Sequence, residues 1–144
     1  MLVNAARIVC TCKSGNNKRM NYVVELERSF RANQGLASPV RRAKGLAAAV
    51  PDGGFSVVLR LGITFKESQL TSSGWFVDTD AVEDLLTAQC DLLASKKWTE
   101  LFDFRPTFEL VARQVFRELQ ADMPQLAYVE LENTTLGVTT RFSA

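Results

Sequence analysis

Apolar and polar residues alternate over three long stretches of the chain, and this two-residue period predicts half-buried β-strands. The stretches are Tyr22 to Phe30, Phe55 to Phe65 and Ala127 to Thr135. A weaker alternation from Ala5 to Cys12 predicts a short strand before them, and Trp75 to Val77 predicts another short one. In the last long stretch, alternation places Tyr128, Glu130 and Glu132 on the face opposite Val129 and Leu131.

Two further stretches carry apolar residues at helical spacing. The first helix is predicted to begin at the capping-box pattern of Asp80 to Glu83. The second is predicted to follow Pro106, with Thr107 as its N-cap, and to end at Met123-Pro124. The apolar positions of the two helices are Val82, Leu85, Leu86 and Leu93, and then Phe108, Val111, Ala112, Val115, Phe116 and Leu119.

The order of elements, strand-strand-helix-helix-strand-strand after the N-terminal strand, predicts an α+β fold. We expect an antiparallel four-stranded sheet with two helices on one face, in a single domain of residues 1–144 whose first 20 residues form an N-terminal extension. The sheet face that carries Glu132 is left uncovered by the helices. Such a face is either wet or covered by another subunit.

Composition narrows the possible functions. The chain has 17 basic and 16 acidic residues, so its net charge of +1 gives no reason to expect nucleic acid or an anionic membrane as a partner. There is no apolar run of about 20 residues and no signal-peptide pattern, which favours a cytoplasmic protein. The sequence contains no histidine, the commonest zinc ligand and general base, so any chemistry must use other groups. Its three cysteines have no framework spacing, and no disulfide is expected.

Candidate polar groups lie at three places. Glu132 ends an alternating strand, although acids on a strand face are usually only solvated. Arg41 and Arg42 belong to a long basic loop between Arg31 and Gly54, which either faces water or lines a pocket for an anionic ligand. Lys97 lies where the end of a helix favours positive charge.

Four local motifs, in order from Tyr22 to Phe142, resemble the tunnelling-fold family of 6-pyruvoyltetrahydropterin and 6-carboxytetrahydropterin synthases. Each motif is weak alone, but the four occur in the family's order with plausible spacing. They are Phe30-Arg-Ala-Asn-Gln34, similar to Phe-Ser-Ala-x-His; Gly74-Trp-Phe-Val-Asp78, similar to Gly-Met-Val-x-Asp; Pro106-Thr-Phe-Glu-Leu-Val-Ala112, similar to Pro-Thr-x-Glu-Asn-Leu-Ala; and Val129-Glu-Leu-Glu-Asn133, similar to Val-x-Val-x-Glu-Thr.

The resemblance implies that Glu132 corresponds to the family's carboxylate, which accepts hydrogen bonds from the pterin ring. A carboxylate is a suitable bidentate acceptor for an amidine or guanidine edge. It also implies that Thr107 lies near the same pocket, although a helix cap explains that residue better, because its position alone accounts for it. Family members assemble from several subunits, so we expect a trimer-based ring and, among such rings, a hexamer. The substrate-binding candidates are Glu132, Asn133, Thr107, Gln34, Trp98, Arg41 and Arg42.

The departures from the family pattern concern its metal. The positions of the three zinc-binding histidines correspond to Gln34, Asp52 and Gly54, which do not supply the three ligands of a catalytic zinc site. The long loop lacks the family's catalytic cysteine, and its Asp-His pair corresponds to Lys97-Trp98. We therefore expect no metal and no other cofactor.

Three hypotheses remain. The first is a metal-independent enzyme of bacterial specialised metabolism that binds a small aromatic or heterocyclic amine on Glu132 and promotes a condensation, a Pictet–Spengler type cyclisation or a lyase step. Its candidate acid/base residues are Glu132, Asp52, Lys97 and Glu100. The second is a non-catalytic pterin- or purine-binding subunit, and the third a structural partner. A Glu132 bridged within the chain would favour the third over the first two.

Overall fold

A computed structural model gives the structure of the chain. It describes residues 5–11, 21–36, 43, 45, 54–66, 68 and 78–144, and in the first strand the path of the backbone only. The predicted strand from Trp75 to Val77 lies outside the described residues. So do three candidate site residues: Arg41, Arg42 and Asp52.

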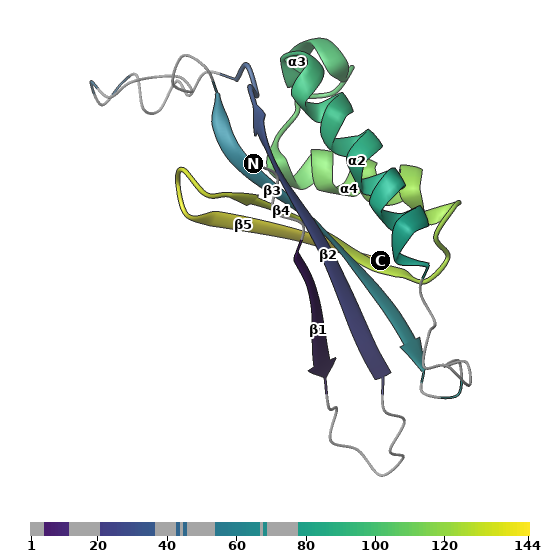
Figure 1. Ribbon diagram of the computed structural model, residues 1–144. Helices are drawn as coiled ribbons and strands as arrows, with labels where there is room; N and C mark the ends of the chain where they lie inside the picture. Colours follow the sequence, from purple (N-terminus) through teal and green to yellow (C-terminus); the bar gives the residue numbers. More distant parts are fainter. Residues whose placement is uncertain are drawn as a thin grey trace.

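Five strands form one antiparallel sheet in the order β1-β2-β3-β4-β5 (Figure 1). The N-terminal strand is therefore an edge strand of the same sheet, next to β2. The long strands β2 and β3 pair over twelve residues each, which makes them the central ribbon of the fold. The strands are β1 (Ala5–Thr11), β2 (Asn21–Ala32), β3 (Phe55–Lys66), β4 (Leu126–Asn133) and β5 (Val138–Ser143).

The described helices all lie on one face of the sheet, as Figure 1 shows. They are α2 (Thr79–Ser95), α3 (Trp98–Leu101) and α4 (Phe108–Gln120). The structure confirms the predicted α+β class, with two long helices on one face of an antiparallel sheet. The short helix α3 was not predicted, because a single turn is too short to show a helical period.

The core lies between the sheet and the helices. Alternate residues of β3 point into it, and Val57, Leu59 and Leu61 have no exposed surface. The same core includes the apolar side of α4, where Val111 and Val115 are also buried. The face of the sheet away from the helices is therefore the only one left to carry the polar half of each strand.

Helix α2 begins two residues earlier than predicted. Its N-cap is Asp78, whose carboxylate accepts a hydrogen bond from the backbone N–H of Ala81 at 3.1 Å, while Asp80 lies within the first turn. The acid three residues before Ala81 is the one that reaches a free N–H, so the predicted cap at Asp80 was wrong by two residues. Thr107 is confirmed as the N-cap of α4, since its hydroxyl accepts from the N–H of Leu110 at 3.4 Å. None of the described helices is long and apolar enough to cross a membrane.

Candidate functional site on the open face of the sheet

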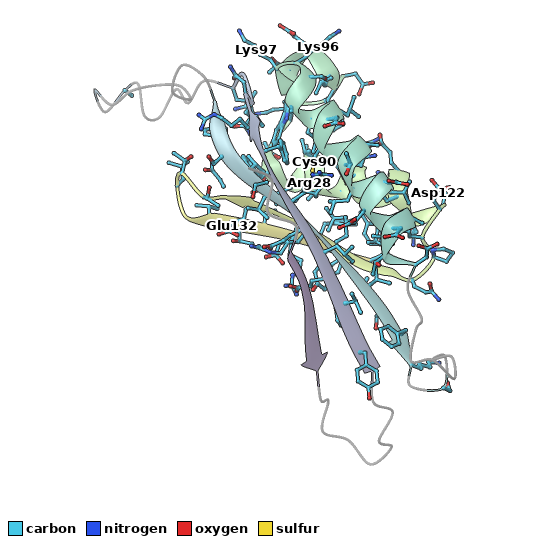
Figure 2. All side chains as sticks on the ribbon, viewed as in Figure 1. Arg28, Cys90, Lys96, Lys97, Asp122 and Glu132 are labelled. Carbon is cyan, nitrogen blue, oxygen red and sulfur yellow. The ribbon has the colours of Figure 1, made fainter. Side chains whose placement is uncertain are left out.

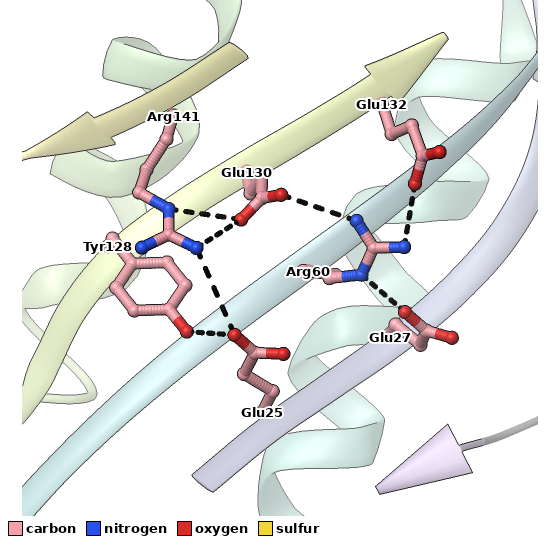
Figure 3. Close-up of polar contacts among 7 residues, drawn as sticks. All are labelled: Glu25, Glu27, Arg60, Tyr128, Glu130, Glu132 and Arg141. Atoms are coloured by element: carbon pink, nitrogen blue, oxygen red, sulfur yellow. Dashed lines mark hydrogen bonds and ion pairs between the residues drawn. The ribbon is translucent and has the colours of Figure 1, made fainter. Parts of the chain in front are cut away.

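The uncovered face carries a cluster of charged side chains from four neighbouring strands (Figure 3). Alternation along β4 places Tyr128, Glu130 and Glu132 on this face, as the sequence predicted, and Val129 and Leu131 in the core. The open-face cluster, as we call it, consists of Glu25 and Glu27 from β2, Arg60 from β3, Tyr128, Glu130 and Glu132 from β4, and Arg141 from β5.

Arg60 is the centre of the cluster because strand register brings acids to it from both sides. In the strand register, Arg60 lies opposite Glu27 of β2 and opposite Glu130 of β4. All three of its nitrogen positions are used. Its Nε donates to Glu27, its Nη1 lies 3.3 Å from Glu130, and its Nη2 lies 2.6 Å from Glu132. Glu132 is thus bridged to Arg60 within the chain, which by the criterion given above favours the structural hypothesis, and only its other oxygen is left for a ligand.

Glu130 joins Arg60 to the second guanidinium. Arg141 donates from Nε and Nη2 to the same oxygen of Glu130, at 3.0 and 2.8 Å. Glu130 is only 7% exposed, so these two cations replace the water that its charge would otherwise need. Arg141 also lies over the ring of Tyr128 at 3.9 Å, and the Tyr128 hydroxyl donates to Glu25.

Gly62 allows Tyr128 to take this position. The two residues face each other across β3 and β4 where the strand register shifts, and the phenol ring lies directly against the glycine. A Cβ at Gly62 would overlap the ring atoms, so only glycine leaves room for the ring on the sheet.

The surroundings of Arg60 and Tyr128 raise the pKa of both groups. Burial opposes the charge of Arg60, but its bonds to Glu132 and Glu27 outweigh burial and raise the pKa above the usual value. Burial and the bond to Glu25 raise the pKa of Tyr128, so its hydroxyl stays protonated. Four glutamates and two arginines then give the described side chains a formal charge of −2. The backbone of β1 adds Arg7 in register with Glu25.

The two acids that flank Arg60 each keep an accepting oxygen. Glu27 and Glu132 use their Oε2 atoms for Arg60, and no hydrogen bond joins either Oε1 atom to another described residue. The Glu132 side chain is 28% exposed and that of Glu27 33%. Both carboxylates can therefore accept a hydrogen bond from a molecule outside the chain.

The other predicted site residues lie at a different place, around α3 and the start of α4. Lys97 precedes α3 and Glu100 lies within it. The side chain of Gln34 donates to the carbonyl of Pro106 at 2.8 Å, next to the cap residue Thr107. Figure 2 shows Lys97 at the end of the helical layer, well separated from Glu132 on the sheet. Within one chain, the candidates therefore do not converge on Glu132.

Trp98 belongs to the core at this end of the molecule. Its side chain has no exposed surface, its indole N–H donates to the carbonyl of Leu93 at 2.9 Å, and its ring packs against Phe108. In this structure it supports α3 and offers no surface to a ligand.

A count along β4 bears on the correspondence predicted from the Val-x-Val-x-Glu-Thr motif. In that motif the glutamate shares a face with the two valines, and counting from Val129 places it at Asn133, not at Glu132. Asn133 is buried on the helix side, and its side chain accepts from the N–H of Leu136 at 3.0 Å in the hairpin turn. Glu132 lies on the opposite face of β4, and its correspondence to the family's carboxylate stays a prediction.

Four members of the open-face cluster were not predicted from the sequence: Arg60, Arg141, Glu25 and Glu27. One signal was available, because Arg60 is the only charged residue between Phe55 and Phe65. Its partners lie in other strands, and their register is visible only in the folded sheet. Among the described residues, no group of three cysteine or acidic side chains is arranged to hold a metal ion.

Comparison with known proteins supports the fold. No protein-family model and no curated protein sequence matches the chain. The structure is similar to that of 6-pyruvoyl tetrahydropterin synthase from Caenorhabditis elegans, with a TM-score of 0.58 and 14% sequence identity, over 100% of this chain and 96% of that chain. The chain therefore has the tunnelling fold of a pterin synthase. At this identity the likeness shows the fold alone.

Proposed function

We propose that this protein is a homo-oligomer that binds a small aromatic or heterocyclic amine on the open face of its sheet, without zinc. The observation that carries the proposal is the pair of acids beside Arg60. Glu27 and Glu132 each present a carboxylate oxygen that has no hydrogen bond to another described residue, in a cluster whose described side chains have a formal charge of −2. A protonated amine or an amidine edge would donate N–H groups to these two oxygens and bring positive charge to the cluster.

Arg60 gives such a site its shape. It holds Glu27 and Glu132 in place from β2 and β4, so neither acid has to be ordered when a ligand binds. The arrangement differs from the family's recognition of a ring by one free carboxylate, since Glu132 is bridged here to Arg60. A ligand on these two acids would contact the open face of the sheet and not the helix side.

Binding is tested by isothermal titration calorimetry with pterin, guanosine and tryptamine as probes, and with zinc measured on the same preparation. We expect at least one amine to bind, with an affinity about tenfold lower in Glu132→Gln because a charge-assisted hydrogen bond becomes a neutral one. Glu109→Gln is the matched control, since Glu109 is an exposed acid in the first turn of α4, outside the cluster. An amine affinity that is equal in Glu132→Gln and Glu109→Gln, or no amine binding to either variant, would contradict the proposal.

A second candidate function is a metal-independent condensation of the Pictet–Spengler type, favoured by the position of Glu132. In this reaction an amine and an aldehyde lose water to form an iminium ion, and an aromatic carbon of the amine then bonds to the iminium carbon. The proton that leaves that aromatic carbon needs a base, and the Oε1 of Glu132, whose side chain is 28% exposed, is available to accept it.

Catalysis is tested by mass spectrometry of tryptamine incubated with acetaldehyde. The expected product is the cyclised amine, formed faster with the wild type than with Glu132→Gln or with no protein. Amine binding without any acceleration would leave a binding protein, and the loss of both would favour a structural role for the Arg60–Glu132 bridge.

A further inference from the structure

A cleft lies at the other end of the helical layer, away from the open-face cluster. It is formed between the first turns of α2 and the connection from α4 to β4, and its volume is about 190 Å³. Its floor is apolar and is made by Ile63, Val82, Leu85 and Met123. Engineered apolar cavities of about 150 Å³ hold a benzene molecule, so this cleft has room for one ring with a short chain.

The rim of the cleft is acidic. Asp78, at the start of α2, and Asp122, in the connection after α4, both line the cleft, and none of its described lining residues is a lysine or an arginine. Asp122 makes no ion pair with a described residue, and Asp78 uses one oxygen to cap α2. Asp80 and Asp84 lie on the same turns of α2 and add negative charge beside the positive end of the helix dipole.

The walls are held by backbone hydrogen bonds, so the cleft does not depend on loose side chains. The N–H of Met123 bonds to Leu119 at 2.9 Å, and the N–H of Leu126 bonds to Met123 at 3.0 Å. The carbonyl of Gln125 accepts from the N–H of Thr64 in β3 at 3.0 Å, which ties the connection to the sheet. Figure 2 shows Asp122 far from Lys97, at the other end of α2.

We infer that this cleft binds a small organic cation, with an apolar ring on its floor and an ammonium group between Asp78 and Asp122. The apolar floor selects the ring by excluding water from it, and the two acids select the charge. The site does not depend on the proposed function, because it shares no residue with the open-face cluster.

The test is a nuclear magnetic resonance titration of the full chain labelled at its methyl groups, since all four floor residues carry methyls. The probes are phenethylammonium and its neutral analogue 2-phenylethanol. We expect the ammonium to shift the methyl signals of Ile63, Val82, Leu85 and Met123, and to bind several-fold more tightly than the alcohol.

Three variants assign the signal. Asp122→Asn is expected to weaken phenethylammonium binding by roughly fivefold, the effect of removing one partly solvated charge. Ala81→Phe, at the exposed rim, is expected to abolish binding by filling the mouth of the cleft. Asp91→Asn removes an exposed acid of α2 outside the cleft and is expected to leave binding unchanged.

Several outcomes would overturn the inference. They are the absence of methyl shifts in the wild type, equal affinity for the ammonium and the alcohol, and an affinity unaffected by Asp122→Asn. Loss of the signal in Glu132→Gln would also overturn it, because the amine would then be bound at the open-face cluster. Binding in the cleft together with no effect of Glu132→Gln on any amine would support the cleft and remove the proposed function.

Discussion

Arg60 balances three carboxylates with one guanidinium, and its side chain is 21% exposed. Replacing it with methionine would leave Glu27, Glu130 and Glu132 close together without a cation. We expect Arg60→Met to lower the free energy of unfolding by about 2 kcal/mol, less than for a fully buried pair because part of the group is solvated. Urea denaturation at low and high salt measures this loss.

Arg141→Met is the matched control for that prediction. Arg141 is 51% exposed and its short contacts go to one acid, so we expect its loss to cost less than about 1 kcal/mol. An equal cost for the two variants would show that Arg60 does not organise the cluster.

The contact between Gly62 and Tyr128 is predicted to couple the effects of substitutions at these two positions on stability. Gly62→Ala would place a methyl group inside the phenol ring and force the ring off the sheet, at a cost of about 2 kcal/mol. In a Tyr128→Ala background the same change has no ring to meet, so most of that cost should disappear. Denaturation of the four proteins in this double-mutant cycle gives the coupling, and additive effects would contradict the contact.

Cys90 gives a pH dependence. Burial, followed by the effect of Asp91, raises the pKa of its thiol from 9.0 to about 12, although Arg28 opposes the shift. Above pH 9 the unfolded chain loses this proton and the folded chain keeps it, so stability is lost as the pH rises from 9 towards 12. The raised pKa of Tyr128 acts in the same direction.

Cys90→Ala should make this alkaline loss shallower, whatever the cavity it leaves costs at neutral pH. Urea denaturation of both proteins from pH 8 to pH 11 compares the slopes. Parallel slopes would mean that Cys90 ionises equally in the folded and unfolded chains.

Two acids at the start of helix α2, Asp78 and Asp80, have different roles in its stability. Asp78→Ala removes the cap that satisfies the N–H of Ala81 and is expected to cost about 1 kcal/mol, whereas Asp80→Ala removes only a helix-dipole charge and should cost about 0.3 kcal/mol. Thermal unfolding of the two variants measures the difference. A larger loss for Asp80→Ala would restore the cap predicted from the sequence.

The strands show what the sequence could and could not predict. Period-2 alternation was enough to place Tyr128, Glu130 and Glu132 together on one face, because the face of a residue depends only on its own strand. The same period makes the motif comparison sensitive to alignment. A shift of one residue exchanges Asn133 for Glu132 and moves the position of the motif's glutamate to the other face of the sheet.

The partners of Arg60 were beyond local prediction for a different reason. Glu27 and Glu130 reach it through the registers of β2 with β3 and of β3 with β4. These registers depend on packing over the whole sheet. Gln34, Lys97, Glu100 and Thr107 were similarly predicted one by one, and their separation from Glu132 follows from which side of the sheet each element covers.

At the scale of the whole molecule, the sheet has helices on one face and a charged cluster on the other. A dry interface would remove water from these ion-paired groups and leave the net negative charge of the described side chains uncompensated, so the open face suits a wet lumen inside a ring of sheets better than a flat apolar contact. In such a ring the edge strands β1 and β5 would be the elements that meet neighbouring copies.

Sedimentation velocity of the wild type near neutral pH and moderate salt tests whether the chain assembles into such a ring. With a chain of 16.0 kDa, a trimer-based ring would sediment as a species of about 48 kDa or, for the expected hexamer, about 96 kDa. A concentration-independent species at either mass is the predicted result. A stable monomer over the same range of concentration would contradict both the ring and the proposal that its open face is a binding surface.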